Sequence, residues 1–318
     1  MIEAHKRPWL VLAGLALGVT VTNGFARFSY GLILPAMQSD LGWNYAQAGW
    51  LNTANALGYI AGAVLTMLMI RQYSATSLFS FGLITTTLAL LATGLISDLW
   101  WQTLWRILVG FFGAMSFSTA GVLAAGLFPN DPRSNALAIS ILFGTGGGLS
   151  IVLSGASLPL FLAHYGAEHW PLAWIIIAAI CLLFLPLCLW SATKLKRPTP
   201  KQADAPAPIP IAQIWAQLAG YAGFGLGYIV FLTFLSAWMT QQAASASFIA
   251  AVWILLGLCI CVSPLVWRPI LTRHASGLPL AMILTCIALG SALPVLFPGN
   301  FSLLLAAVIF GLSVFMAP

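Results

Sequence analysis

The chain has 318 residues, of which 61% are hydrophobic and 6% are charged, and its formal net charge is +6 at pH 7. A soluble domain carries roughly 25% charged residues, so this composition excludes a water-soluble globular fold. The excess positive charge lies between apolar segments, where it directs membrane insertion, and it gives no indication of nucleic-acid binding.

Ten apolar segments follow one another along the chain, and a bilayer core requires about 20 apolar residues per helix. The sequence therefore predicts an all-α polytopic membrane protein. The first segment follows basic residues like a signal peptide, but it is long and nine further segments follow, so we expect it to remain as a helix. The predicted segments cover about 9–37, 46–70, 76–97, 99–128, 136–163, 172–193, 211–239, 246–267, 277–297 and 301–318.

The basic residues fall on one side of the predicted membrane. Ten of the 12 Lys and Arg residues lie in the connections on the side of the N-terminus, whereas Asp40, Asp98 and Glu168 lie in the opposite connections. Because basic connections stay in the cytoplasm, we expect a cytoplasmic N-terminus in a cell inner (plasma) membrane.

One connection differs from the others. The stretch "KLKRPTPKQADAPAPIPIAQ", from Lys194 to Gln213, is basic and rich in Pro and Ala, which is typical of a linker. We expect a six-helix bundle over 1–193, a cytoplasmic linker over 194–210 and a four-helix bundle over 211–318. A shift of 201 residues places Gly24 over Gly225 and Gly110 over Gly311, which indicates two parallel repeats.

Three stretches carry a resemblance to a known family: "GFARFSYGLILPAMQSDLGW", "WRILVGFFGA" and "FGTGGGLSIVLSG". With them, the whole chain resembles the major facilitator superfamily and, within it, the uncharacterised YbfB-like (YbfB/YjiJ) transporters. The resemblance implies a bundle of twelve helices, so we expect this chain to lack the last two. Members of the superfamily usually carry an acidic residue, an Arg and a Gly in the connection after the second segment, which helps to control the inward-facing gate. In this chain that connection, "MLMIRQYSATS", has only the Arg, Arg71.

Two arginines are the only charged residues inside the predicted segments. Arg27 and Arg106 lie at similar depths, and placing an Arg at the centre of a membrane helix costs about 3 kcal/mol on insertion scales. The resemblance implies that their helices, the first and the fourth, line one central cavity. Alternatively, each side chain reaches the membrane interface, or pairs there with Asp40 or Asp98.

Polar residues share helix faces with these arginines. Two sets of polar residues are spaced three or four positions apart: Thr20, Asn23, Arg27 and Tyr30 on the first segment, and Asn52, Asn55 and Tyr59 on the second. Residues at this spacing share one face of a helix. We expect such polar faces to point into a cavity or the bundle interior rather than toward lipid. Hydrogen bonds between helices are the alternative explanation for the asparagines. Three residues of the seventh segment could complete the site from the other half: Gln217, Tyr221 and Tyr228. The candidate substrate-binding residues are Arg27, Asn23, Tyr30, Arg106, Asn55 and Tyr228.

Glycines on the fourth and fifth segments indicate close helix packing. Gly110 and Gly113 follow Arg106 at helical spacing, and we expect them to form a close contact surface. The glycines from Gly144 to Gly155 have the same interpretation, although they could also allow the helix to bend.

No phosphate-binding loop, metal-ligand cluster or paired carboxylate lies at membrane depth, so we expect neither an enzyme nor a bound cofactor or metal. The predicted function is a secondary active transporter that moves a small organic solute by alternating access and acts as a monomer. With no carboxylate inside the membrane to pair with Arg27 and Arg106, an anionic solute is the expected counter-charge. Two alternatives remain: a membrane sensor or scaffold that transports nothing, and a truncated inactive remnant.

Overall fold

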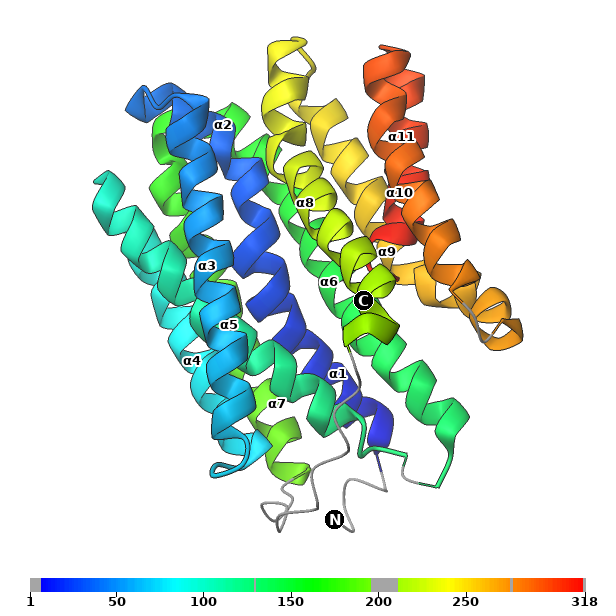
Figure 1. Ribbon diagram of the computed structural model, residues 1–318. Helices are drawn as coiled ribbons and strands as arrows, with labels where there is room; N and C mark the ends of the chain where they lie inside the picture. The colour runs from blue at the N-terminus through cyan, green and yellow to red at the C-terminus, as the bar shows by residue number, and fades with distance from the viewer. Residues whose placement is uncertain (1–6, 129, 196–210, 275–276, 317–318) are drawn as a thin grey trace.

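The computed structural model describes residues 7–128, 130–195, 211–274 and 277–316 (Figure 1). Within these ranges the protein is all-helical, as predicted. The helices are α1 Pro8–Val19, η1 Thr20–Phe28, α2 Ser29–Leu41, α3 Tyr45–Met69, α4 Ala75–Thr93, α5 Leu99–Ala124, α6 Pro132–Tyr165, η2 Ala167–His169, α7 Trp170–Lys194, α8 Ile211–Gln241, α9 Ala246–Arg273, α10 Leu278–Leu296 and α11 Asn300–Val314.

The ten predicted segments all correspond to helices. In the described part of the chain, nine are long and apolar enough to cross a membrane, and α11 is a shorter apolar helix. The first segment is a single span, Pro8–Leu41, made of α1, η1 and α2. It extends beyond the predicted end at residue 37, because the helix stops only at Gly42, whose left-handed φ of 64° suits glycine.

Polar residues begin several helices at the bundle ends. Asn44 and Gln47 form a reciprocal capping box at the start of α3. The Asp98 carboxylate accepts the backbone N–H groups of Trp100 and Trp101, both at 2.9 Å, and so begins α5. Asp131 begins α6 in the same way, and its hydrogen bonds with Ser134 lower the pKa of its carboxyl below the ordinary value.

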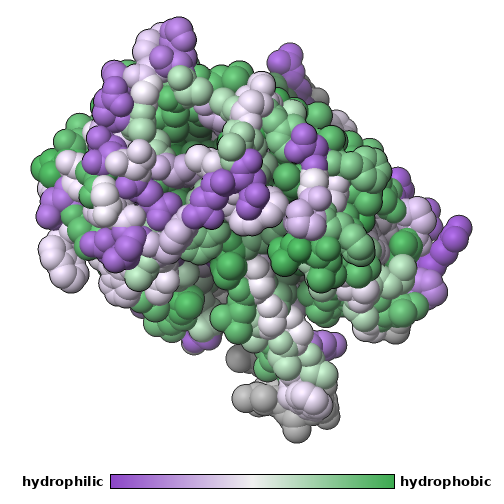
Figure 2. Space-filling view, turned by 90° about the horizontal axis from the view of Figure 1, so that it is seen from above, coloured by the Kyte–Doolittle hydropathy of each residue, from purple (hydrophilic) through white to green (hydrophobic). Residues whose placement is uncertain are grey.

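Charge divides the two ends of the bundle. We call one the basic end; Arg7, Arg71, Arg133, Lys194 and Arg273 lie at or near it. The other, the acidic end, carries Asp40, Asp98 and Glu168. Seen along the helices, hydrophilic residues gather on the end that faces the viewer, and much of the lateral surface is apolar (Figure 2). This distribution suits a surface surrounded by lipid.

Glycines bring the backbones of α3 and α5 together. A Cβ atom added at Gly110 would lie 2.1 Å from the Asn55 carbonyl oxygen, and one added at Gly58 would lie 2.1 Å from that of Ile107. At Gly113 it would lie 2.7 Å from the Thr22 carbonyl oxygen. The predicted contact surface of Gly110 and Gly113 is therefore confirmed.

The glycines of α6 form a second close contact, with α9. Added Cβ atoms at Gly148 and Gly155 would lie 2.7 Å from the Cys261 Sγ and 2.6 Å from the Trp253 Cβ. This contact joins helices α1–α7, which we call the first half, to helices α8–α11, the second half (Figure 1). The division into bundles 1–193 and 211–318 stays a prediction, and the proposed linker lies outside the described residues beyond Leu195.

Candidate substrate-binding site

A π-helical segment in the middle of the first span positions Arg27. The π-helix η1 covers Thr20–Phe28, and all its residues except Arg27 are buried. The Thr20 hydroxyl is within hydrogen-bond distance of the Gly146 carbonyl oxygen of α6, at 2.8 Å, and a Cβ at Gly24 would collide with Ser150. Segments of π-helix are rare and frequently mark functional sites. Here η1 packs tightly against α6 and leaves Arg27 partly exposed.

Two tyrosines from different halves flank Arg27. The carbon at the centre of its guanidinium lies 5.2 Å from the ring centroid of Tyr59 on α3 and 5.6 Å from that of Tyr228 on α8. These distances are typical of cation–π contacts. No hydrogen bond or ion pair to the Arg27 side chain is found among the described residues, so its N–H groups can bind a ligand.

Arg106 has a different environment, because its side chain is fully buried. One terminal nitrogen donates a hydrogen bond of 3.0 Å to the Ala26 carbonyl oxygen in η1. The guanidinium lies 4.6 Å from the Tyr30 ring centroid and 5.6 Å from a Trp174 ring centroid. Its Nε and second terminal nitrogen have no hydrogen-bond partner among the described residues. Arg106 thus supports the backbone next to Arg27 and is closed to solvent in this state.

The remaining candidates divide between these two environments. The Tyr30 hydroxyl donates to the Ala48 carbonyl oxygen at 2.8 Å, and the Asn55 amide donates to the Arg106 carbonyl oxygen at 3.0 Å. The Asn23 side chain is 5% exposed and has no hydrogen bond among the described residues. The structure therefore brings Tyr228 to Arg27, and Tyr30 and Asn55 to Arg106.

The alternative that Asp40 and Asp98 neutralise the arginines is wrong in this structure. The Asp40 carboxylate accepts a hydrogen bond of 2.8 Å from the Trp170 indole, and Asp98 begins α5. Neither arginine has an ion pair among the described residues. Both positive charges therefore lie without a carboxylate partner in the described part of the bundle.

Some residues of this site were not among the sequence candidates. Tyr59 shares a helix face with Asn55, which is a signal that could have selected it. Phe224 stacks on Tyr228, with ring centroids 4.4 Å apart and an interplanar angle of 9°, and its spacing of four residues was a weaker signal. No sequence signal pointed to Trp174, because the packing of α7 against α4 and α1 brings it to Arg106.

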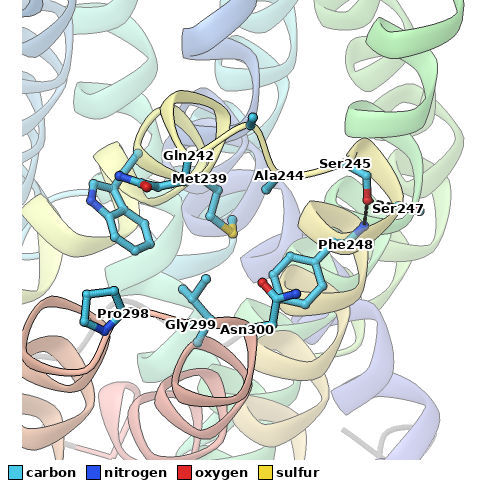
Figure 3. A pocket seen from close by; sticks show the side chains of 12 residues that line it. Met239, Gln242, Ala244, Ser245, Ser247, Phe248, Pro298, Gly299 and Asn300 are labelled. Carbon is cyan, nitrogen blue, oxygen red and sulfur yellow. Dashed lines mark hydrogen bonds between the residues drawn. The ribbon is translucent and has the colours of Figure 1, made fainter.

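Neither arginine lines either of the two cavities described below. A cavity of about 840 Å³ opens between the α8–α9 and α10–α11 connections. Gln242, Met239, Asn300 and Phe248 are among its lining residues, none of which is charged (Figure 3). A second cavity of about 380 Å³ lies between α3 and α8. Neither is lined by Arg27, so charge and contacts, rather than cavity size, identify the candidate site.

Comparison with known proteins establishes the family. The family model described as "Uncharacterised MFS-type transporter YbfB", where MFS denotes the major facilitator superfamily, matches residues 19–317. The chain belongs to this family. The predicted resemblance is therefore confirmed, and the protein is an MFS-type transporter by family and a multi-pass membrane protein.

One curated relative is a protein of Haemophilus influenzae whose name places it in metabolite transport. It is 29% identical to this chain over 169 residues, which are 52% of this chain and 39% of the relative. The chain thus matches well under half of that relative's length.

Solved structures show the same fold. A bacterial homologue of the human lysosomal transporter Spinster, in an inward-facing and unoccupied conformation, has a TM-score of 0.65 and 19% identity, covering 96% of this chain and 73% of its own. A mutant of the nucleoside transporter NupG has a TM-score of 0.68 and 12% identity, covering 96% of this chain and 80% of its own. At these identities, the likeness concerns the fold alone.

Proposed function

We propose that this protein is a secondary transporter that carries a small organic anion across the inner membrane by alternating access, with Arg27 as the anion-binding residue. The observation that carries the proposal is the partly exposed Arg27 guanidinium, which lies between the two halves and has no hydrogen-bond partner among the described residues. A carboxylate, sulfonate or phosphate accepts two parallel hydrogen bonds from such a group.

The position of Arg27 also supports alternating access. Tyr59 belongs to the first half and Tyr228 to the second, so a movement of one half against the other changes the surroundings of Arg27. The halves meet near the acidic end as well, where a Cβ at Gly31 would lie 2.4 Å from the Leu232 carbonyl oxygen. With the basic end in the cytoplasm, as the placement of charge favours, these contacts close the outer side.

The other candidate residues support Arg27 in this proposal. Arg106 adds positive charge behind η1 and holds the Ala26 carbonyl, Tyr30 and Asn55 hold Arg106, and Asn23 offers a free amide on the same segment. A sensor without transport would share this anion site, so binding alone does not separate the two functions. Flux of the bound anion separates them, because only a transporter would show it. An inactive remnant would show neither binding nor flux.

The test uses the purified protein, first in detergent and then in proteoliposomes. A thermal-shift screen with carboxylates, sulfonates and phosphates is expected to reveal an anion that stabilises the protein, and counterflow of that anion is expected in proteoliposomes. Arg27→Gln should weaken binding at least tenfold, since a charge-assisted hydrogen bond contributes about 1.5–3 kcal/mol. Arg27→Lys should weaken it less, because the charge stays while the planar group is lost.

Arg71→Gln is the matched control, because it removes the same charge from an exposed residue of the basic end. Anion binding that survives in Arg27→Gln, or that Arg71→Gln weakens equally, would reject the anion site. Binding without any flux of the bound anion would favour the sensor.

A further inference from the structure

Two rows of aromatic side chains begin at Arg27. In the first half, the ring centroids of Tyr59 and Phe117 lie 6.2 Å apart, and those of Phe117 and Phe143 lie 4.7 Å apart. We call these three residues the first aromatic row. On α8, Tyr228 stacks on Phe224 at 4.4 Å, and the Tyr221 ring lies 6.4 Å from that of Phe224. We call Tyr228, Phe224 and Tyr221 the second aromatic row.

Both rows run from Arg27 toward the basic end. On α5, Phe117 lies 11 residues beyond Arg106, which is about 16 Å along the helix. On α8, Tyr221 lies seven residues before Tyr228, or about 10 Å nearer the basic end. The guanidinium, which contacts the first ring of each row, therefore stands at their common start.

The rings are not fully enclosed in the core. Tyr59, Phe117, Phe143 and Phe224 are partly exposed, and Tyr221 is 42% exposed, whereas Tyr228 is buried against Arg27. None of the members is charged, and the Arg27 guanidinium contacts the first ring of each row. Aromatic surface from both halves therefore adjoins Arg27.

We infer that the substrate is an aromatic carboxylate, whose carboxylate binds Arg27 and whose ring packs against the two aromatic rows. This inference rests on the proposed anion transport. A small hydrophilic anion would bind Arg27 but would cover little of the exposed ring surface of the two rows. An aromatic body stacks on them in offset or edge-to-face geometry, and each such pair adds affinity beyond the burial of area.

The test compares ligands that differ in one property, on the purified full chain. Phenylacetate and cyclohexylacetate share a carboxylate and differ in the ring, acetate lacks the ring, and 2-phenylethanol lacks the charge. Titration calorimetry is expected to give phenylacetate at least fivefold stronger binding than cyclohexylacetate, with acetate and 2-phenylethanol weaker still.

Two variants remove one ring from each row. Phe117→Leu and Phe224→Leu should each reduce the preference for phenylacetate over cyclohexylacetate about two- to tenfold, the range expected for one aromatic pair. Phe81→Leu is the control, because this phenylalanine of α4 is 53% exposed and belongs to neither row. If Phe117→Leu lowers the yield of folded protein, Phe224→Leu decides.

Failure of this inference and failure of the anion site give different results. If phenylacetate and cyclohexylacetate bind with equal affinity, and Phe224→Leu changes neither affinity, the aromatic substrate class is overturned. If Arg27→Gln then abolishes the binding of both ligands, the anion-binding site is still supported. If no carboxylate binds, or if Arg27→Gln has no effect, both proposals are overturned.

Discussion

The guanidinium carbon of Arg27 lies 5.6 Å from the centroid of the Tyr228 ring. Arg27 belongs to the first span and Tyr228 to α8, so this contact joins residues that are about 200 positions apart in the chain. Because each half contributes one partner, the contact reports on how the halves lie relative to one another. It also places an aromatic face, rather than a carboxylate, beside the charge.

Tyr228→Leu should destabilise the unliganded protein by about 1 kcal/mol, because it removes a cation–π contact with Arg27 and the stacking on Phe224. Tyr228→Phe keeps a ring in the same place and should stay within about 0.5 kcal/mol of the original, since the aromatic ring rather than the hydroxyl makes both contacts. Thermal unfolding in detergent measures the two variants. An equal loss of stability in Tyr228→Leu and Tyr228→Phe would show that the contact of the ring face with Arg27 does not stabilise the protein.

Gly110→Ala should lower the folded yield and cost about 1–3 kcal/mol, as overpacking generally does. The new Cβ would lie 2.1 Å from the Asn55 carbonyl oxygen, so α3 and α5 would have to separate. Gly223→Ala is the matched control on α8, because nothing lies within 4 Å of its added Cβ and Ala favours a helix over Gly. Normal yield and stability of Gly110→Ala would argue against the close approach of these helices.

Cysteines at positions 52 and 233 should cross-link the two halves. The Asn52 amide donates a hydrogen bond of 2.8 Å to the Thr233 hydroxyl, so the side chains meet between α3 and α8. The experiment uses a background without the five native cysteines and a protease site in the connection 196–210. After oxidation and cleavage, the double variant should run as one band that reducing agent splits.

Single-cysteine variants are the controls for that cross-link. A double variant that gives no more cross-linked product than they do would mean that α3 and α8 stay apart at this level. Where the cross-link forms, it should also stop flux in proteoliposomes, because alternating access requires this end to open.

A cysteine at Ala203 should react with membrane-impermeant thiol reagents only after the cells are opened. Its connection is basic, and basic connections remain in the cytoplasm. A cysteine at Gln242, exposed at the acidic end, should react in intact cells and serves as the control. If Ala203→Cys is labelled in intact cells and Gln242→Cys is not, the protein has the opposite orientation in the membrane.

Much of the fold follows from local sequence, because a bilayer imposes its requirements on each segment separately. About 20 apolar residues are needed to cross it, and every backbone polar group must be paired within the segment. The positions of the ten helices could therefore be predicted, with errors of a few residues at ends such as Leu41, where polar Ser39 and Asp40 still continue the helix. Gly110 could be assigned to a close contact because small residues drive packing between membrane helices.

The site could be predicted only as a set of residues. Asn23, Arg27 and Tyr30 belong to one face by spacing. Spacing does not reveal that η1 is a π-helix in which Arg27 alone is not buried. Two arginines of similar depth looked equivalent in sequence. In the tertiary structure, Arg27 lies at the contact between the halves, whereas Arg106 is enclosed by Tyr30 and Trp174. Burial and pairing depend on which helices meet. Contacts between segments far apart in the chain decide this, so the difference between the two arginines could not be predicted from local sequence.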